Sequence, residues 1–262
     1  MEERLLERDW RFVMDSVYQF YSMGSIYSFE QTVLECMSAL IPATQTMIFQ
    51  TTQDEYKNVV FLRCTSIGDP VRFMDEFLSG EYTEEPYFKR WGFFTDTKTF
   101  RDTDMMPEEY RTNTKIFKDI YAKQGIYYGL RSYLVHDGKA IGNICFFNSQ
   151  EEGDFSARDL YVLDMIAPHI ALKYGWLIAE AEKQDDRASL RNFLSKNGLT
   201  SREQEIALMV FSEQKDDEIA DDLCISKTTF KKHIYNIYRK LGVNNRVQLF
   251  TTLYEANDRA KG

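Results

Sequence analysis

The residues from Ile225 to Val243, ISKTTFKKHIYNIYRKLGV, fit one kind of local structure. At about 100° per residue, four apolar side chains fall within about 60° of one another on a helical wheel: Phe230, Ile234, Ile237 and Leu241. The opposite side carries cations, a hydroxyl and a phenol: Thr228, Lys232, Tyr235 and Arg239. Ser226 is placed to cap this helix and Gly242 to end it. The pattern predicts a helix with a narrow core face and a polar, cationic opposite face.

Charge separates this helix from the rest of the chain. Six bases and no acid occur between Lys227 and Arg246, although the whole protein has a formal net charge of -9. Residues 196–262 hold eleven Lys/Arg and ten Asp/Glu, which leaves 21 bases and 31 acids for residues 1–195. The N-terminal part should therefore repel DNA, while the basic stretch can attract it locally. The simpler alternative is a solvated basic face on an ordinary surface helix.

Two short helices are expected before the basic helix. Thr200 and Glu203 have the spacing of a capping box. The next helix is DDEIADDL, and its acids at 216–217 suit the positive end of the helix dipole. A turn of about three residues joins this helix to the basic one, and a last helix is expected from about 245 to 256. A short helix, a tight turn and a second helix with an acid-free outer face predict a helix-turn-helix, whose second helix enters the major groove of DNA.

At this point the sequence resembles the LuxR-type DNA-binding domain. The resemblance covers roughly residues 197–258 and rests on the following matches: Leu199-Thr-Ser-Arg-Glu203, Glu218-Ile-Ala220, Leu223-Cys-Ile-Ser226, Thr229-Phe-Lys231, His233, Asn236-Ile237, Lys240-Leu-Gly-Val243 and Arg246. It implies a four-helix domain that binds double-stranded DNA as a homodimer. Two departures stand out: the glycine usual before the second helix is replaced by Glu213-Gln214-Lys215, and Phe230 replaces a smaller apolar residue.

The resemblance also assigns roles to residues. It places Lys231, Lys232 and Tyr235 at base-reading positions. Thr229, Asn236 and Lys240 resemble residues that contact phosphates or position the helix. Ser226, Thr228 and Arg239 complete the expected contacts with the DNA backbone. The acidic run 213–222 is either a solvated helix start or a contact for RNA polymerase.

The N-terminal part has a mixed α and β pattern. Strands are expected at 46–52, 59–65, 130–136 and 139–147, and Asp137-Gly138 predicts a hairpin between the last two. Helices are expected at 29–40, 108–122 and from Phe155 onward. The fold class that follows is an α+β sensor domain, with an antiparallel sheet flanked by helices, followed by an all-α four-helix helix-turn-helix domain.

The N-terminal part resembles GAF and PAS sensor domains, on the Asp137-Gly138 hairpin, the strand GNICFF and the helix DFSARDLYVLDMIAPHI. Such domains hold a small molecule between the sheet and its covering helices. The expected ligand-contacting residues are aromatic: Tyr87, Trp91, Phe93, Phe94, Tyr110, Tyr127, Tyr128 and Tyr133. The alternative is that these rings only fill a core. The chain does not fit a receiver domain, nor the lactone-binding pattern, because Trp91 is followed four residues later by Thr95.

The helix from Phe155 carries an apolar seam: Leu160, Leu163, Ala167, Ile170, Tyr174, Leu177 and Ala181. We expect its first half to pack on the sheet and its second half to contact a second subunit. The helix is expected to fade in the charged stretch that follows. The predicted division is therefore a sensor and dimerisation domain at 1–181, a linker at 182–197 and the DNA-binding domain at 198–262.

Several classes of function do not fit the sequence. The four cysteines show no CxxC pair, which favours buried thiols in a reducing compartment over a zinc site or a disulfide frame. The N-terminus is too charged for a signal peptide, and 160–181 is interrupted by charged residues and a proline, so a cytoplasmic protein without a membrane segment is expected. We see no cofactor motif, no metal cluster and no nucleophile–base set, which disfavours an enzyme. The remaining alternative is a DNA-binding regulator whose N-terminal domain is a ligand-free dimerisation or docking module.

Overall fold

The computed structural model describes residues 6–67 and 91–258 and divides the chain into two compact units. The first unit is Met1–Ile178 and the second is Ala179–Gly262. Each is described here by itself. The predicted fold class, an α+β domain followed by a helical domain, is confirmed.

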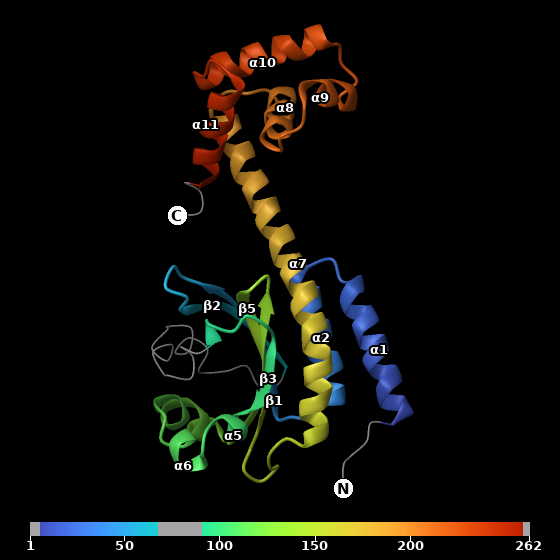
Figure 1. Cartoon of the computed structure of the whole chain (residues 1–262), viewed down its shortest axis with the longest axis vertical. Helices are drawn as coiled ribbons and strands as arrows, with labels where there is room; N and C mark the ends of the chain where they lie inside the picture. The colour runs from blue at the N-terminus through green and yellow to red at the C-terminus, as the bar shows by residue number, and fades with distance from the viewer. Residues whose placement is uncertain (1–5, 68–90, 259–262) are drawn as a thin grey trace. The chain divides into compact units, whose positions relative to one another are not determined.

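The first unit is built on a five-stranded antiparallel sheet with the order β2-β1-β5-β4-β3 (Figure 1). The strands are β1 Gln45–Gln53, β2 Val59–Ile67, β3 Lys98–Arg101, β4 Tyr128–His136 and β5 Lys139–Asn148. The predicted hairpin joins β4 to β5, and Asp137 and Gly138 both have positive φ, 49° and 69°. Such a turn matches the twist of the two strands. The short β3 was not expected from the sequence.

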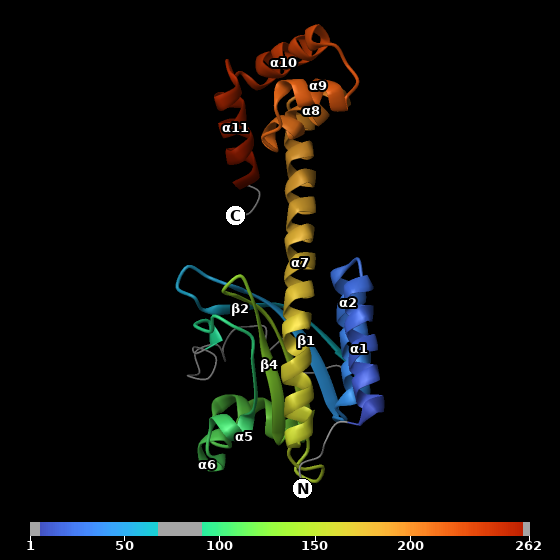
Figure 2. The same ribbon diagram turned by 45° about the vertical axis from the view of Figure 1, so that its right-hand side comes forward.

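Helices cover one face of this sheet. They are α1 Glu7–Ser22, α2 Ile26–Leu40 and α7 Ala157–Lys196. In Figures 1 and 2, α2 and α7 lie against the sheet and α1 lies on their outer side. The α7 seam is buried in this core as far as Leu177. Tyr174 and Leu177, in the second half of the seam, are buried in this core and cannot form the subunit contact expected for that half, whereas Ala181 is only partly buried and its subunit contact stays a prediction.

The other face of the sheet carries a second, aromatic core. Its covering elements are short: α5 Asp102–Met105, α6 Glu108–Arg111, a π-helical turn Phe117–Tyr121 and a 3₁₀ turn Ala122–Gln124. The single helix expected at 108–122 is thus broken. At the break, the side chains of Thr112, Asn113 and Thr114 donate hydrogen bonds back to main-chain carbonyls three or four residues earlier. Such bonds compete with a continuous helix.

The second unit is helical. It contains α8 Ser201–Phe211, α9 Asp216–Asp222, α10 Lys227–Leu241 and α11 Arg246–Asp258. The expected fading of α7 is wrong, because α7 continues without interruption to Lys196. Its charged residues are mostly good helix formers, and Leu190 and Leu194 are buried in the helical core. The domain bounds 1–181, 182–197 and 198–262 stay a prediction.

Candidate nucleic-acid interface and sensor site

Helix α10 is held in place by its apolar stripe, as its sequence pattern predicts. Phe230 and Ile237 are buried in the helical core, and Ile234 and Leu241 pack against it. The Ser226 hydroxyl caps the helix by accepting a hydrogen bond from the Thr229 backbone N–H at 3.1 Å. Gly242 ends it in the left-handed conformation, with φ 67°.

Two turns around α9 have the backbone of glycine turns without glycine. Glu213, in the segment where the family has glycine, has φ 62°, and Cys224, between α9 and α10, has φ 51°. A side chain with a Cβ pays roughly 1–2 kcal/mol in this conformation. At 213–215 the expected glycine is replaced, but Glu213 still adopts the left-handed backbone conformation that a glycine would have in this turn.

The structure divides the six bases of the acid-free stretch into two groups. Three of them pair with acids from other helices. Lys227 Nζ lies 2.8 Å from Asp217 Oδ1 of α9, and Arg246 of α11 forms an ion pair with Asp216, also of α9. Lys240 Nζ donates to Glu203 Oε2 of α8 at 2.6 Å. These pairs join α8, α9, α10 and α11 and neutralise three of the six bases.

The other three bases are Lys231, Lys232 and Arg239. All three are exposed, and none has an ion pair with the residues that the structure describes. On the helical wheel Lys232 and Arg239 point away from the core, together with the exposed Tyr235 and Thr228. This unpaired cationic surface, defined by Lys231, Lys232, Tyr235 and Arg239, is the part of α10 that is open to an anionic partner.

The remaining predicted contact residues differ in exposure. Ser226 and Thr229 are exposed at the start of α10, and their hydroxyls lie 2.9 Å apart. Asn236 is half-buried on the flank of the helix. The Lys240 side chain is only 25% exposed and forms an ion pair with Glu203. This pair favours a role for Lys240 in positioning α10 over a contact with a DNA phosphate.

Glu203 is a buried carboxylate at the N-terminus of α8. It forms the predicted capping box with Thr200, whose backbone N–H donates to Glu203 Oε2 at 2.8 Å. Burial opposes ionisation of Glu203, but the hydrogen bonds from Lys240 and from Thr200 outweigh it and lower the pKa of the carboxyl. Glu203 is therefore ionised in the folded domain at neutral pH.

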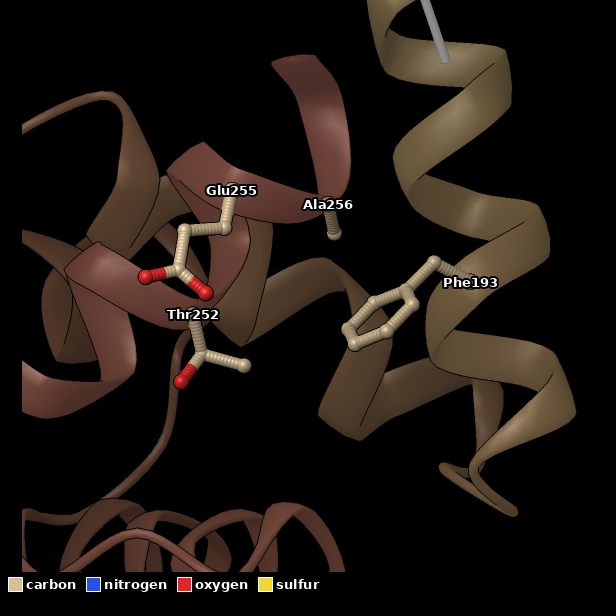
Figure 3. Close-up of a pocket in the computed structure, with 4 residues that line it drawn as sticks. All are labelled: Phe193, Thr252, Glu255 and Ala256. Carbon is tan, nitrogen blue, oxygen red and sulfur yellow. The ribbon is translucent and has the colours of Figure 1, made fainter. Parts of the chain in front are cut away.

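The hollows described for the helical unit lie away from α10. One, of about 190 Å³, is formed where α11 faces the end of α7, and Figure 3 shows Phe193 extending toward Thr252 and Ala256. Another, of about 580 Å³, runs along α7, α8 and α9. Neither is lined by a residue of α10. The cationic side of α10 is exposed, with Lys231, Lys232, Tyr235 and Arg239 open to solvent.

In the first unit, three of the predicted pocket aromatics meet on the second face of the sheet. The rings of Trp91 and Tyr133 are stacked with centroids 4.2 Å apart, and Phe94 lies 5.7 Å from Tyr133. Trp91 and Tyr133 are almost fully buried. Within the described residues, the Trp91 Nε1 has no hydrogen-bond partner, nor does the Thr51 hydroxyl or the Asn143 carbonyl oxygen. These atoms are the polar groups at this cluster that a bound molecule would satisfy.

The other predicted pocket residues differ in position. Tyr127, just before β4, is half-buried and packs against this same aromatic core, whereas Tyr128, at the start of β4, packs against the core on the helical face of the sheet. Phe93 and Tyr110 are 66% and 75% exposed, which does not suit the wall of a buried site. Tyr87 lies outside the described residues.

Sequence reasoning missed the charged residues of this face. Arg131 of β4 donates from Nε and Nη2 to the two carboxylate oxygens of Asp102, each at 2.7 Å, and from Nη2 to the Tyr121 hydroxyl at 2.9 Å. Burial raises the pKa of Tyr121 to about 12 in spite of the nearby Arg131. The signal in the sequence was an arginine inside the mostly apolar strand at 130–135, because an arginine is rarely fully buried unless it is paired.

Comparison with known families decides the nature of the helical unit. The family described as "Bacterial regulatory proteins, luxR family" matches residues 197–253. Residues 197–253 form a luxR-family domain. The HTH-type transcriptional regulator MalT of Serratia proteamaculans is 44% identical over 48 residues, which are 18% of this chain and 5% of MalT. The chain thus spans about 5% of the length of this relative, and the likeness is confined to the luxR-family domain.

Solved structures that are similar to this chain include two bacterial proteins. The ligand-binding domain of VqsR from Pseudomonas aeruginosa has a TM-score of 0.47 at 14% identity and covers 63% of this chain and 96% of that one. Escherichia coli SdiA has a TM-score of 0.44 at 14% identity and covers 95% of this chain and 98% of that one. Both TM-scores are below 0.5, so the description of the first unit rests on its own sheet order and register.

Half of the apolar window of α7 is buried in the fold. Among the described residues α7 is the helix that is long and apolar enough to cross a membrane by length and composition alone. Its buried seam on the sheet identifies it as a core helix. The described residues contain no cluster of three His, Cys, Asp or Glu side chains that could hold a metal ion.

Proposed function

We propose that this protein is a cytoplasmic, homodimeric transcription regulator that reads specific DNA sequences through α10 and is controlled by a small ligand in its first unit. One observation carries the DNA-binding part. Within a luxR-family domain, the three bases of the acid-free stretch that lack ion pairs lie on the exposed surface of α10 with Tyr235. Unpaired cations on an exposed helix surface are what a phosphate-lined major groove attracts.

The proposed roles follow from exposure. Lys231, Lys232 and Tyr235 read base edges. Arg239, with Thr228 and the hydroxyls at the start of the helix, contacts the DNA backbone. Phosphate contacts fix the register and base contacts select the sequence, so both groups are needed on one helix face.

The dimer is supported by an exposed apolar surface on the first unit. Large apolar side chains recur on one side of α1 and on the neighbouring side of α7: Trp10, Met14, Tyr18, Leu172 and Trp176. The Tyr21 ring lies 5.9 Å from the Trp176 ring and joins the two helices. Large exposed apolar side chains gathered on two neighbouring helices are typical of a subunit contact. A regulator that binds two half-sites requires a two-fold contact of some kind.

The sensor part of the proposal is supported by the aromatic core of the first unit and by its unsatisfied polar atoms. The second candidate is a first unit that binds no ligand and serves for dimerisation or docking, and the full burial of the stacked Trp91 and Tyr133 rings favours it. A thermal-shift screen separates the two, because a ligand of the folded state raises its stability by RT ln(1 + [L]/Kd). A contact of the acidic α9 with RNA polymerase also belongs to the proposal, with Glu218 and Asp221 exposed and outside the ion pairs described above.

Selection of bound sites from random DNA tests the proposal. The full chain and a fragment of residues 182–262 are compared, and the fragment must include Leu190 and Leu194 because they are buried in its core. We expect the full chain to enrich a site with two-fold symmetry. Enrichment by the fragment alone would mean that the first unit restrains DNA binding until a signal arrives. If neither enriches a sequence, α10 is not a sequence reader and the proposal is refuted.

A further inference from the structure

Arg111, at the end of α6, is a buried arginine surrounded by aromatic rings. It is 5% exposed. Its guanidinium carbon lies 4.8 Å from the ring centroid of Tyr127, 5.5 Å from that of Phe117 and 5.6 Å from that of Tyr128. Rings that approach a guanidinium in this way satisfy its charge only in part. Its N–H groups still need acceptors.

One edge of this guanidinium has no acceptor in the part of the chain that the structure describes. Nη1 donates to the backbone carbonyl of Tyr127. Nε and Nη2 are buried and have no hydrogen-bond partner among those residues. These two nitrogens carry the parallel N–H groups that bind both oxygens of a carboxylate at once. The unsatisfied edge of Arg111 therefore has the geometry of a carboxylate receptor.

In Arg131 the same two nitrogens, Nε and Nη2, do have acceptors. Its Nε and Nη2 donate to the two oxygens of Asp102, each at 2.7 Å. Arg111 has no such ion pair within residues 6–67 and 91–258. The acid one turn earlier, Glu108, accepts a hydrogen bond from the Tyr127 hydroxyl, which raises the pKa of that tyrosine. A buried charge without its counterion is destabilising, so an unsatisfied buried guanidinium needs an explanation, and a ligand that supplies the counterion is one.

The surroundings restrict what the counterion can be. Tyr127 and Tyr128 are half-buried, so the rings around Arg111 reach the surface of the unit, and Tyr110 beside it is exposed. Because Nε and Nη2 themselves are buried, an acid would reach them only when these surface rings move apart, and its apolar part would then meet the rings.

We propose that Arg111 binds the anionic group of the effector, and that the effector is a small organic acid, a carboxylate or a phosphate, with an aromatic or apolar body. The inference rests on the proposed sensor function and names its ligand class. Two coplanar anionic oxygens of the ligand would accept hydrogen bonds from Nε and Nη2 of Arg111, as the two oxygens of Asp102 do from Arg131. The aromatic rings would hold the apolar body.

The first test is the stability of the unliganded protein. Arg111→Met keeps the alkyl stem and removes the charge, so we expect the melting temperature of the full chain to stay the same or rise. The matched control is Arg131→Met, which strands Asp102 and should lower the melting temperature by several degrees. Tryptophan fluorescence reports this unit, because Trp10, Trp91 and Trp176 all precede residue 179.

The second test is binding of defined probes. Benzoate, inorganic phosphate and the neutral isostere benzamide are titrated against the wild type, Arg111→Met and Arg111→Lys. We expect benzoate to raise the melting temperature of the wild type and benzamide to leave it unchanged. Arg111→Met should abolish the shift, and Arg111→Lys should weaken it at least about tenfold in apparent Kd, because lysine lacks the planar fork. A shift with phosphate alone would identify the anion as a phosphate.

The outcomes separate this inference from the proposed function. The inference is overturned if Arg111→Met is as destabilising as Arg131→Met, if no anion stabilises the wild type, or if the benzoate shift persists in Arg111→Met. Site-specific DNA binding would be untouched by any of these results. If the anion binds through Arg111 but never alters DNA binding, the anion site stands and the sensor role in the proposed function fails.

Discussion

Replacing Lys240 by methionine should destabilise the luxR-family domain while leaving the salt dependence of DNA binding unchanged. In the structure Lys240 Nζ donates to Glu203 Oε2 at 2.6 Å and joins α10 to α8. Methionine keeps most of the apolar stem and removes the ammonium. Glu203, whose side chain is 4% exposed, would then lose its only ionic partner among the described residues.

The expected cost follows from burial. Breaking a fully buried ion pair costs about 3–5 kcal/mol, because the remaining charge is left uncompensated. Lys240 is 25% exposed, so water screens part of the interaction, and Glu203 keeps the hydrogen bond from the Thr200 backbone. We therefore expect about 2 kcal/mol at neutral pH, or roughly a 30-fold change in the opening equilibrium of the domain.

The pH dependence has a definite sign. Because the folded-state pKa of Glu203 is lowered, its ionisation stabilises the domain above the unfolded pKa of about 4.3. That contribution is lost as the pH falls through the lower folded-state pKa. In Lys240→Met one of the interactions that lower this pKa is gone, so the variant should lose less stability than the wild type on acidification.

Hydrogen exchange followed by mass spectrometry is the assay, because all three tryptophans lie outside this domain. Peptides from α8 and α10 should exchange about 30-fold faster in Lys240→Met. Lys232→Met, which changes an exposed lysine of the same helix, is the control and should leave exchange unchanged. In parallel, Arg239→Met should reduce the slope of log Kobs against log salt by about 0.9, while Lys240→Met should not. Unchanged exchange together with a reduced slope in Lys240→Met would refute the positioning role.

Three further predictions concern the same domain. Lys232→Ala should cost about 1–3 kcal/mol on the selected site and relax the preference at one base position, which competition binding with single-base variants measures; an equal loss on random DNA would assign Lys232 to the backbone. Glu213→Gly should stabilise the domain by about 0.5–1 kcal/mol in urea denaturation followed by circular dichroism, because Glu213 has φ 62° and glycine adopts this conformation without strain. Gly242→Ala should destabilise it by about 1 kcal/mol in the same assay, since Gly242 has φ 67° and open space around it; no change would mean that the turn after α10 adjusts freely.

The sequence by itself determined the local structure of the luxR-family domain. The stripe of Phe230 and Ile237, the Thr200–Glu203 capping box and the helix-ending Gly242 each depend on residues within one helix or one turn. Helical periodicity and capping act over three or four residues, so spacing is sufficient to predict them. The Asp137-Gly138 hairpin was predictable for the same reason.

Tertiary structure decided which of the charged and aromatic residues remain available. Six bases look equivalent in sequence, yet Lys227, Lys240 and Arg246 are neutralised by acids 10 to 37 residues away. The same holds for the two buried arginines, of which one has a carboxylate and the other has an unsatisfied edge. Pairing across helices and strands depends on which side chains the fold brings within hydrogen-bond distance, and no local pattern encodes that distance. The chemistry open to a partner is therefore what remains after the fold has satisfied its own charges.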